Sequence, residues 1–376
     1  MHFFAKKKRK NNRLFLILVW FFLTAILLST STYAWFTANK TVNIDTIDVK
    51  VSTSSGLQIS ADGEEWKTVL TKEDLENASV KWLNAKNQLP DEMAPVSTAK
   101  EVDGNGRLKM FFGDVYADLT PGSDNYGEYV LESSLLSDLE ADGAEGKYIA
   151  FDVFLKSGNI AKDLYMSGNV VEIHEVPDPT DPSKTIWQEI TDPTQESGIA
   201  NAARVGVIKG GNTQSTDVST IRGLTTVGGK AYIWEPNFDY HTDNGIANGT
   251  SLGWINNGST THVAGNGGSI IAYDGLYAPT TQAIKLSNVV NTDPLGSAVA
   301  KPVAIDWSSQ KGQNPISLKF PDTAHDAAGN DLTNGVTKFR IYMWVEGQDI
   351  DAENYASGTH VEYSLSFSLE EIQANP

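Results

Sequence analysis

An all-β sandwich is the fold that the sequence predicts, and two observations lead to it. Several short segments alternate apolar and polar residues, which is typical of strands with one buried face. Turn residues separate these segments, and few stretches have the periodicity of a helix. The chain has no cysteine, and 40% of its residues are hydrophobic, so burial rather than disulfide bonds must hold the fold together.

The first 34 residues have the pattern of a secretory signal peptide. A basic head is followed by the apolar run Leu14–Leu28, whose fifteen residues include Thr24 as the one polar member, and by small residues that end at Ala34. We therefore expect residues 1–34 to be removed by cleavage between Ala34 and Trp35. The alternative is an uncleaved membrane anchor, although a spanning helix needs about 20 apolar residues. Both interpretations send residues 35–376 out of the cytoplasm.

The exported part is strongly acidic. Six of the 29 Lys and Arg residues lie in the basic head, so 23 basic residues face 47 acidic ones beyond it, a net charge of −24. Phosphate binding is driven by Lys and Arg, so this balance disfavours nucleic acid as a partner. It also disfavours anionic lipid surfaces, which leaves the uncleaved signal segment as the only predicted membrane contact. An acidic, self-repelling surface suits a secreted protein.

The exported part begins with a strand whose pattern changes phase. Val42 and Ile44 alternate with polar residues, and Ile47, Val49 and Val51 alternate again, but the interval from Ile44 to Ile47 is odd. Such a change predicts a bulge or a strand that changes partners. Farther on, Thr71 with Asp74 three residues later predicts the cap of a short helix.

The rest of the exported part reads as one sandwich domain with long loop insertions. The stretches 147–156 and 163–173 are predicted to form a strand pair, and the four prolines of residues 177–198 predict a surface loop. Residues 241–300 are rich in Gly, Asn, Ser and Thr, and are predicted to be long loops on the sheets. Two closing strands follow, with alternating apolar residues at Phe339–Val345 and Val361–Leu369.

Few residues have the pattern of a catalytic or metal site, and an enzyme is not predicted. His174-Glu175 begins like a zinc-protease motif, but Pro177 follows and no second histidine lies one helical turn on. One acidic cluster follows a strong strand and has oxygen ligands at the alternating positions that suit calcium. A solvated acidic turn is the competing interpretation, and no other cofactor is expected. The cluster consists of Glu346, Asp349, Asp351 and Glu353.

Three stretches of the chain resemble the TasA/camelysin family of Gram-positive bacteria. They are TYAWFTANK with the strand segments that follow it, KYIAFDVFLKSGNIAKDLYMS, and ENYASGTHVEYSLSFSLEEIQ. The resemblance implies a jelly-roll-like antiparallel sandwich, a dedicated SipW-type signal peptidase, and a role as a subunit of an extracellular fibre or biofilm matrix. Camelysin-like members have been described as metalloproteases, but the incomplete His174-Glu175 motif does not support that activity here.

The resemblance also implies how subunits would join. The N-terminal segment freed by cleavage, about Trp35–Val51, would complete the sheet of a second copy, with main-chain hydrogen bonds giving affinity. The alternative is an ordinary first strand in its own sandwich. The residues expected to fill the pockets of the acceptor are Val42, Ile44, Ile47, Val49 and Val51.

Two functions therefore stay open. The first is a secreted homopolymer, located in the extracellular matrix or at the cell surface. The second is a secreted or surface binding module, an adhesin or carbohydrate-binding protein that uses the loops of residues 241–300. Trp234, Trp254, Tyr273 and Tyr277 lie in or near that insertion and would offer aromatic faces to a sugar.

Overall fold

The structure is a computed structural model, and its described residues all belong to the unit Trp35–Pro376. The described ranges are 41–51, 56–82, 85–117, 119–124, 126–127, 129–136, 146–158, 164–192, 195–225, 231–234, 242–245, 284–285, 318–320, 335–347, 349, 351–352 and 358–369. The predicted signal peptide, Ala34 and Trp35, and nearly all of the 241–300 insertion lie outside them.

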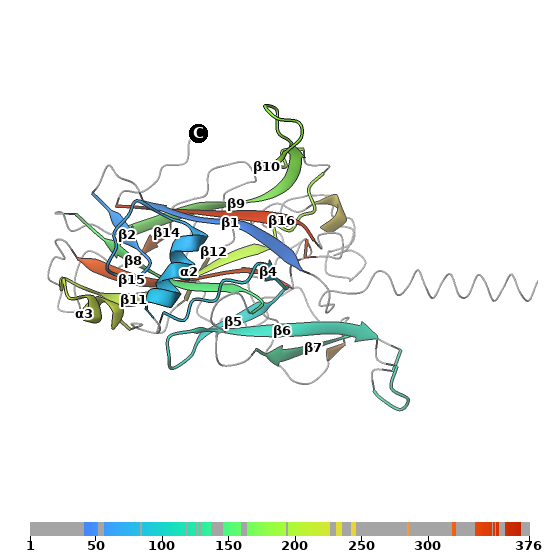
Figure 1. Ribbon diagram of the computed structural model, residues 1–376. Coiled ribbons are helices and arrows are strands. Elements are labelled where there is room, and N and C mark those ends of the chain that lie inside the picture. The colour runs from blue at the N-terminus through green and yellow to red at the C-terminus, as the bar shows by residue number, and fades with distance from the viewer. Residues whose placement is uncertain are drawn as a thin grey trace, which may run out of the picture. The chain divides into compact units, whose positions relative to one another are not determined.

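Two β-sheets form a sandwich (Figure 1). The seven-stranded sheet has the order β10 (Thr185–Glu189), β9 (Leu164–Pro177), β16 (His360–Ser368), β1 (Val42–Val51) and β3 (Val69–Leu70), with β14 (Leu318–Phe320) beside β9 and β4 (Glu92–Met93) beside β1. The five-stranded sheet has the order β12 (Ala231–Trp234), β11 (Ala203–Thr213), β15 (Val336–Val345), β8 (Ile149–Lys156) and β2 (Gln58–Ser60). The predicted all-β class is confirmed.

One strand pair departs from the antiparallel arrangement that we expected. β1 and β16 are parallel, whereas the other pairs between the described strands are antiparallel. The two strands come from opposite ends of the described chain, so no hairpin forces them to run in opposite directions.

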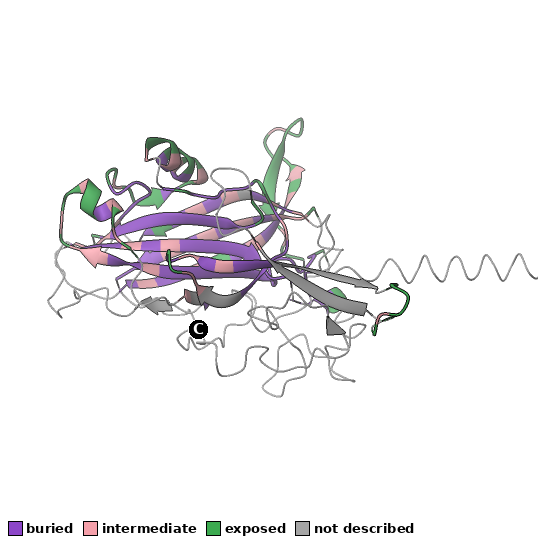
Figure 2. Cartoon of the chain, turned by 90° about the horizontal axis from the view of Figure 1, so that it is seen from below, coloured by how far each residue is buried: buried purple, intermediate pink, exposed green. Residues whose placement is uncertain are grey.

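The main core lies between these two sheets (Figure 2). Alternate residues of β15 and β16 meet there, as the sequence predicted for the two closing strands. Those of β15 are Phe339, Ile341, Met343 and Val345, and those of β16 are Val361, Tyr363, Leu365 and Phe367. Phe339 and Phe367 stack across the core, with ring centroids 5.9 Å apart.

A third sheet covers part of the outer face of the five-stranded sheet. It has the order β13 (Ile284–Lys285), β7 (Tyr129–Leu135), β6 (Leu108–Ala117) and β5 (Ser97–Val102). Leu108 and Met110 of β6 pack in a second cluster with Tyr342 and Trp344, and the backbone N–H of Leu108 donates to the Tyr342 hydroxyl at 3.1 Å. Because both its faces are covered, β15 has hydrophobic residues on each side.

The predicted strand pair in residues 147–176 is wrong in its pairing. Both strands exist, but β8 pairs with β15 and β2, whereas β9 pairs with β16, β10 and β14 in the opposite sheet. Alternating side chains identify a strand but not its neighbour. The loop predicted at 177–198 is also corrected in part, because Thr185–Glu189 forms β10, an exposed strand paired with the end of β9. Trp187 and Ile186 are its exposed apolar side chains.

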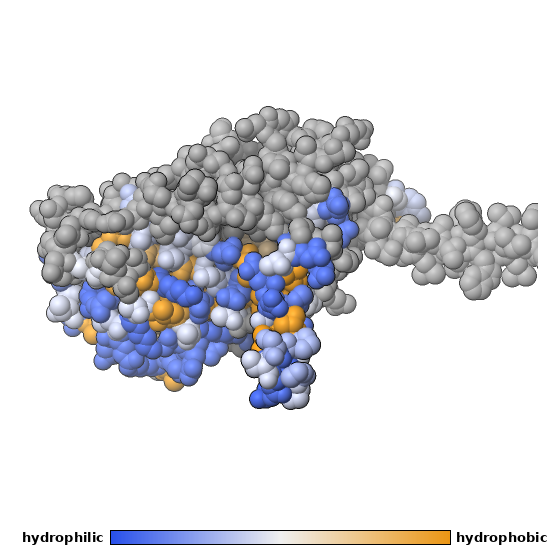
Figure 3. Space-filling model, turned by 90° about the horizontal axis from the view of Figure 1, so that it is seen from above, coloured by the Kyte–Doolittle hydropathy of each residue, from blue (hydrophilic) through white to orange (hydrophobic). Residues whose placement is uncertain are grey.

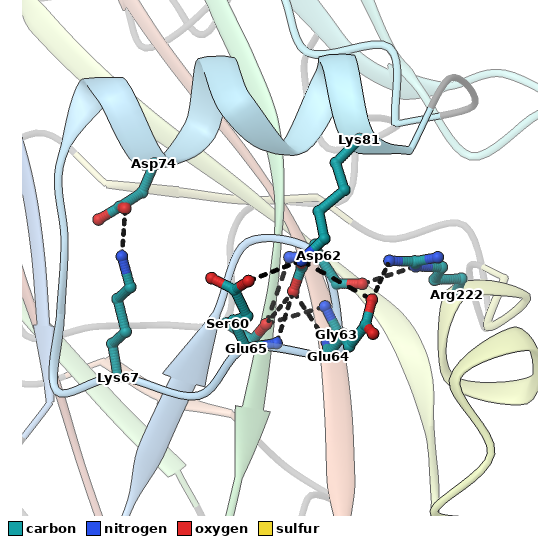
Figure 4. Close-up of polar contacts among 9 residues, drawn as sticks. All are labelled: Ser60, Asp62, Gly63, Glu64, Glu65, Lys67, Asp74, Lys81 and Arg222. Atoms are coloured by element: carbon teal, nitrogen blue, oxygen red, sulfur yellow. Dashed lines mark hydrogen bonds and ion pairs between the residues drawn. The ribbon is translucent and has the colours of Figure 1, made fainter.

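Charged side chains link two short helices to the sandwich by an ion pair and a hydrogen bond (Figure 4). Helix α2 (Lys72–Lys81) begins with the capping box predicted at Thr71, because Thr71 and Asp74 each accept the other's backbone N–H. Lys81 at its end lies 3.0 Å from the Asp62 carboxylate. Arg222 of α3 (Val218–Arg222) donates to the Asp62 carbonyl at 2.7 Å, so both helices meet one turn.

The outer surface is mixed in hydropathy. On the face shown in Figure 3, small hydrophobic areas lie among hydrophilic residues. Within the described ranges no helix is both long enough and apolar enough to cross a membrane.

Candidate functional site

The candidate assembly site is the position of β1 in the seven-stranded sheet. On one side β1 pairs with β16 in parallel, from Asn43 opposite His360 to Val51 opposite Phe367. On its other side, β4 pairs with the start of β1 and β3 with its end. The structure thus places the predicted assembly strand inside the chain's own sheet.

All five predicted assembly residues point into the sandwich core. None has more than 7% of its surface exposed, and Ile47 and Val49 have none. The register with β16 shifts between Ile44 and Thr46, which confirms the bulge that the phase change predicted. Because the bulge adds one residue, both apolar runs face the same core. The five are Val42, Ile44, Ile47, Val49 and Val51.

Backbone hydrogen bonds fix the start of β1 on both of its edges. At its start, Asn43 donates its N–H to the Thr359 carbonyl at 2.9 Å, and Gly358 donates to the Thr41 carbonyl at 2.8 Å. On the other edge, Ile44 donates to the Asp91 carbonyl at 2.9 Å. These are main-chain bonds, so any segment with a suitable apolar pattern could make them.

Side chains of β16 and β10 lie beside the start of β1. The Asn43 Nδ2 atom lies 3.2 Å from His360 Nε2, and the ring of Trp187 lies over that of His360 with centroids 4.3 Å apart. Trp187 is 42% exposed, so this aromatic pair is at the surface. The exposed β9–β10 hairpin therefore contacts His360, the first residue of β16, which lies beside the start of β1.

Burial of the apolar side chains of β1 contributes a large free energy to the stability of the fold. Burying one Val or Ile side chain contributes roughly 1.5–3 kcal/mol, so five contribute on the order of 10 kcal/mol. A typical domain is stable by only about 5–15 kcal/mol. A sandwich that lost β1 would therefore be close to unfolding, or would need another strand in its place.

Three of the four predicted calcium residues lie in a different place, at the end of β15, and they are not solvated. Glu346, Asp349 and Asp351 have no exposed surface, so the solvated acidic turn is wrong. Asp349 forms an ion pair with Arg204 of β11 at 2.7 Å, and both side chains are fully buried. The ion pair thereby joins the segment after β15 to the start of β11, the neighbouring strand in the same sheet.

The other two buried acids also accept hydrogen bonds from the protein. Asp351 accepts from the N–H and the hydroxyl of Thr242 at 3.0 and 2.7 Å, and Glu346 accepts from the Trp344 indole N–H at 3.2 Å. Among the described residues, no group of three or more His, Asp or Glu side chains is placed to hold a metal ion. Glu353, the fourth predicted ligand, is outside those residues.

Two features of this end of the molecule escaped the sequence reasoning. Glu172 of β9 is buried, and its carboxylate accepts backbone N–H groups of Ser197 and Gly198 at 2.7 and 2.9 Å. Arg204 is fully buried as well. An arginine inside the apolar run ARVGVI is the signal that could have predicted a buried acidic partner.

His174 and Glu175 lie on β9 opposite Gln188 and Trp187 of β10, in a hairpin rather than a helix. This placement agrees with the absence of a zinc-protease motif in the sequence. His174 is partly exposed and Glu175 is exposed.

No protein-family model matches the chain, and neither a curated protein nor a solved structure matches it.

Proposed function

We propose that the chain is a secreted structural subunit that assembles into an extracellular fibre or matrix by exchange of strand β1. In the assembly, β1 of one copy would occupy, in a second copy, the position between β16 and the pair β3 and β4. The observation that carries this proposal is the N-terminal strand itself, which is held by main-chain bonds and five buried apolar side chains.

The same contacts that hold β1 in its own sheet would hold it in another copy. Exchange therefore changes little in contact energy, and it becomes favourable when the subunit concentration exceeds the effective concentration of the chain's own strand. Withdrawing β1 costs on the order of 10 kcal/mol, so exchange between finished monomers is slow. Assembly is then fastest when β1 becomes free before it has entered its own sheet.

This timing gives the expected signal peptide a role. While residues 1–34 are attached to the membrane, the adjoining strand is restrained. Cleavage after Ala34 by a dedicated peptidase would free it to pair with a neighbouring copy. We also include in the proposal the jelly-roll topology and the membership of the TasA/camelysin family that the sequence resemblance implies.

The test uses the absence of cysteine from the chain. Asp48 of β1 lies opposite Ser364 of β16 in the parallel register. One form of residues 35–376 would carry Asp48→Cys and another would carry Ser364→Cys. The two are mixed during refolding and then oxidised. A disulfide between neighbouring strands requires Cα atoms within about 7 Å, so a linked dimer forms only if β1 of one copy enters the sheet of the other.

Matched controls make the result specific. Each single variant, oxidised alone, gives the amount of dimer that forms by random collision. A mixture of Ser364→Cys with Lys184→Cys gives the amount that forms with an unrelated surface, because Lys184 is an exposed residue of the β9–β10 hairpin. We expect the yield of reduction-sensitive dimer to be far above both backgrounds. We also expect fibres in negative-stain micrographs of the unmodified chain. Dimer at the background level together with monodisperse particles would contradict strand exchange.

Residues 241–300, which the alternative of a binding module would use, lie almost wholly outside the described ranges.

A further inference from the structure

Strand β10 is an open edge of the seven-stranded sheet. Among the described strands it pairs with β9 alone, and it stands at the end of the sheet order. The hairpin that it forms with β9 extends beyond the sandwich (Figure 1), and all five residues of β10 are exposed. An edge strand of this kind can pair with another chain, because one row of its backbone donors and acceptors has no partner in the sheet.

The register of the hairpin shows which backbone groups form that open row. Ile190 donates its N–H to the Glu172 carbonyl at 2.9 Å, and Asp178 donates to the Lys184 carbonyl at 2.9 Å. In an antiparallel pair, hydrogen-bonded and non-hydrogen-bonded positions alternate. The even positions of β10 therefore bond to β9, and the odd positions direct their N–H and C=O groups away from it. The odd positions are Thr185, Trp187 and Glu189.

The strand lacks the features that usually keep sheet edges apart. Those features are prolines, bulges and charged side chains along the edge. Within Thr185–Glu189 there is no proline, the register with β9 has no shift, and Glu189 at the end is the only charged residue. The middle of the strand instead has Ile186 and Trp187, which are 41% and 42% exposed. Neighbouring residues of a strand point to opposite faces, so each face of this edge carries one exposed apolar side chain.

Two copies of this edge match each other about a two-fold axis. When two β10 strands run antiparallel with Trp187 opposite its own copy, Thr185 of each strand lies opposite Glu189 of the other. All three are odd positions, so this alignment engages the whole open row, with about six main-chain hydrogen bonds. It also brings Ile186 diagonally beside its own copy on the opposite face. An alignment centred on Ile186 would instead place Glu189 opposite Ser183, which lies outside the strand.

We propose that β10 is an interaction surface for a second copy of this chain, through antiparallel pairing of the two edges centred on Trp187. Symmetry identifies the occupant, because the open row and the apolar pair at its middle are each their own complement under a two-fold axis. A pair of five-residue strands covers less area than most stable interfaces bury, so isolated subunits associate weakly.

This pairing does not involve β1. In an assembly built by exchange of β1, the same edges would join neighbouring fibres side by side, and many weak contacts would act together. That role in a fibre rests on the proposed function, whereas the pairing of two subunits does not.

Disulfide trapping tests the proposal, because it captures a weak pair. One form of residues 35–376 would carry Thr185→Cys and another would carry Glu189→Cys, which leaves both exposed apolar side chains in place. The two folded forms are mixed and oxidised. Opposite residues of antiparallel strands have Cα atoms about 5.5 Å apart at hydrogen-bonded positions, which is within the range of a disulfide.

Each form oxidised alone is the matched control. In the proposed alignment, either cysteine would lie four residues, or about 13 Å, from its own copy, which is too far for a disulfide. We therefore expect about 10-fold more reduction-sensitive dimer from the mixture than from either form alone.

A second comparison tests the apolar pair. Trp187→Ser added to both forms removes the central side chain and should lower the dimer yield about 10-fold, as the loss of a tryptophan at the centre of an interface does. Val80→Ser added in the same way is the matched control, because Val80 is a hydrophobic residue of α2 that is 77% exposed. It should leave the yield unchanged.

Each contrary result has its own meaning. A yield from the mixture no higher than from either form alone would overturn a second copy as the occupant and leave a different protein as the partner of β10. Thr185→Cys linked to itself as readily as to Glu189→Cys would overturn the alignment, and an unchanged yield with Trp187→Ser would overturn the role of the apolar pair. A trapped dimer without fibres in micrographs would support this pairing and contradict strand exchange, so the two proposals fail separately.

Discussion

Val49 of β1 lies opposite Leu365 of β16, and neither side chain has any exposed surface. This pair joins the first described strand to the last one in a parallel ladder. The centre of the seven-stranded sheet is therefore closed by a contact between residues more than three hundred positions apart. Bringing together residues so far apart costs chain entropy, which the contact must offset before it adds to stability.

Shortening Val49 to alanine should destabilise the folded chain by about 2 kcal/mol, because the lost methyl groups leave a cavity in a dry core. Urea unfolding followed by tryptophan fluorescence measures this change. Lys50→Ala is the matched control, since Lys50 is exposed and its ion pair with Asp48, at 3.3 Å, is a surface contact. Equal effects of the two variants would contradict the burial of β1.

The cap of helix α2 gives a second prediction. Thr71→Ala removes the hydroxyl that accepts the Asp74 backbone N–H, and should cost about 1 kcal/mol of stability. Thr68→Ala, at an exposed position just before β3, is the control and should change stability by less than about 0.5 kcal/mol. The unfolding free energies of both variants measure the difference. A loss for Thr68→Ala as large as that for Thr71→Ala would argue against the cap.

Local patterns in the sequence predicted local structure well. The spacing of Thr71 and Asp74 predicted a cap, because a cap depends on residues only a few positions apart. The odd interval from Ile44 to Ile47 likewise predicted either a bulge or a change of strand partners, and the structure has the bulge. The alternation in Val361–Leu369 likewise predicted which side of a strand is buried.

Contacts between distant residues were beyond such patterns. The pairing of β8 with β15 and of β9 with β16 joins strands about two hundred residues apart, and alternation has no information about partners. The acids at 346–351 looked like a solvated turn because the whole chain is acidic. The burial of Asp349 depends on Arg204, which is about 145 positions away in the sequence.

That buried ion pair leads to a third prediction. Arg204→Met removes the cation and leaves the Asp349 carboxylate buried without its partner, which should cost about 3–5 kcal/mol. The loss should appear as a lower urea midpoint. Thermal unfolding should likewise have a lower midpoint temperature for Arg204→Met than for the unmodified chain.

The double variant Arg204→Met/Asp349→Asn provides the control. The amide oxygen of asparagine can still accept the Asp351 N–H, which Asp349 now accepts at 3.0 Å, but it carries no charge. We therefore expect the double variant to be more stable than Arg204→Met alone. A double variant that is less stable would show that lost packing, rather than an unpaired charge, causes the defect.

The last prediction concerns acid stability and rests on Asp62. Its carboxylate accepts the backbone N–H groups of Glu64 and Glu65, both at 2.8 Å, and lies 3.0 Å from Lys81 Nζ (Figure 4). Burial would raise the pKa of Asp62. The hydrogen bonds from Glu65, Glu64, Lys81 and Ser60 outweigh that effect and lower the pKa to about 2.

A lowered carboxyl pKa stabilises the folded state only where the unfolded chain is also ionised. As the pH falls from about 4 to about 2, the unfolded chain takes up the proton first, and a contribution of at most about 2 kcal/mol is lost. Asp62→Asn keeps the oxygen that accepts both N–H groups but lacks the charge. The variant should therefore be less stable than the unmodified chain at pH 6, and this difference should shrink towards pH 2.

Unfolding free energies measured in urea across that pH range test this expectation. Asp91→Asn is the matched control, because Asp91 is an exposed carboxylate whose partner, Lys72, lies at the surface of α2. Its effect should stay within about 0.5 kcal/mol at every pH. If the loss in Asp62→Asn were the same at pH 2 and at pH 6, then the shape of the hydrogen-bonded turn, and not the charge of Asp62, would be what stabilises the junction of α2 and α3.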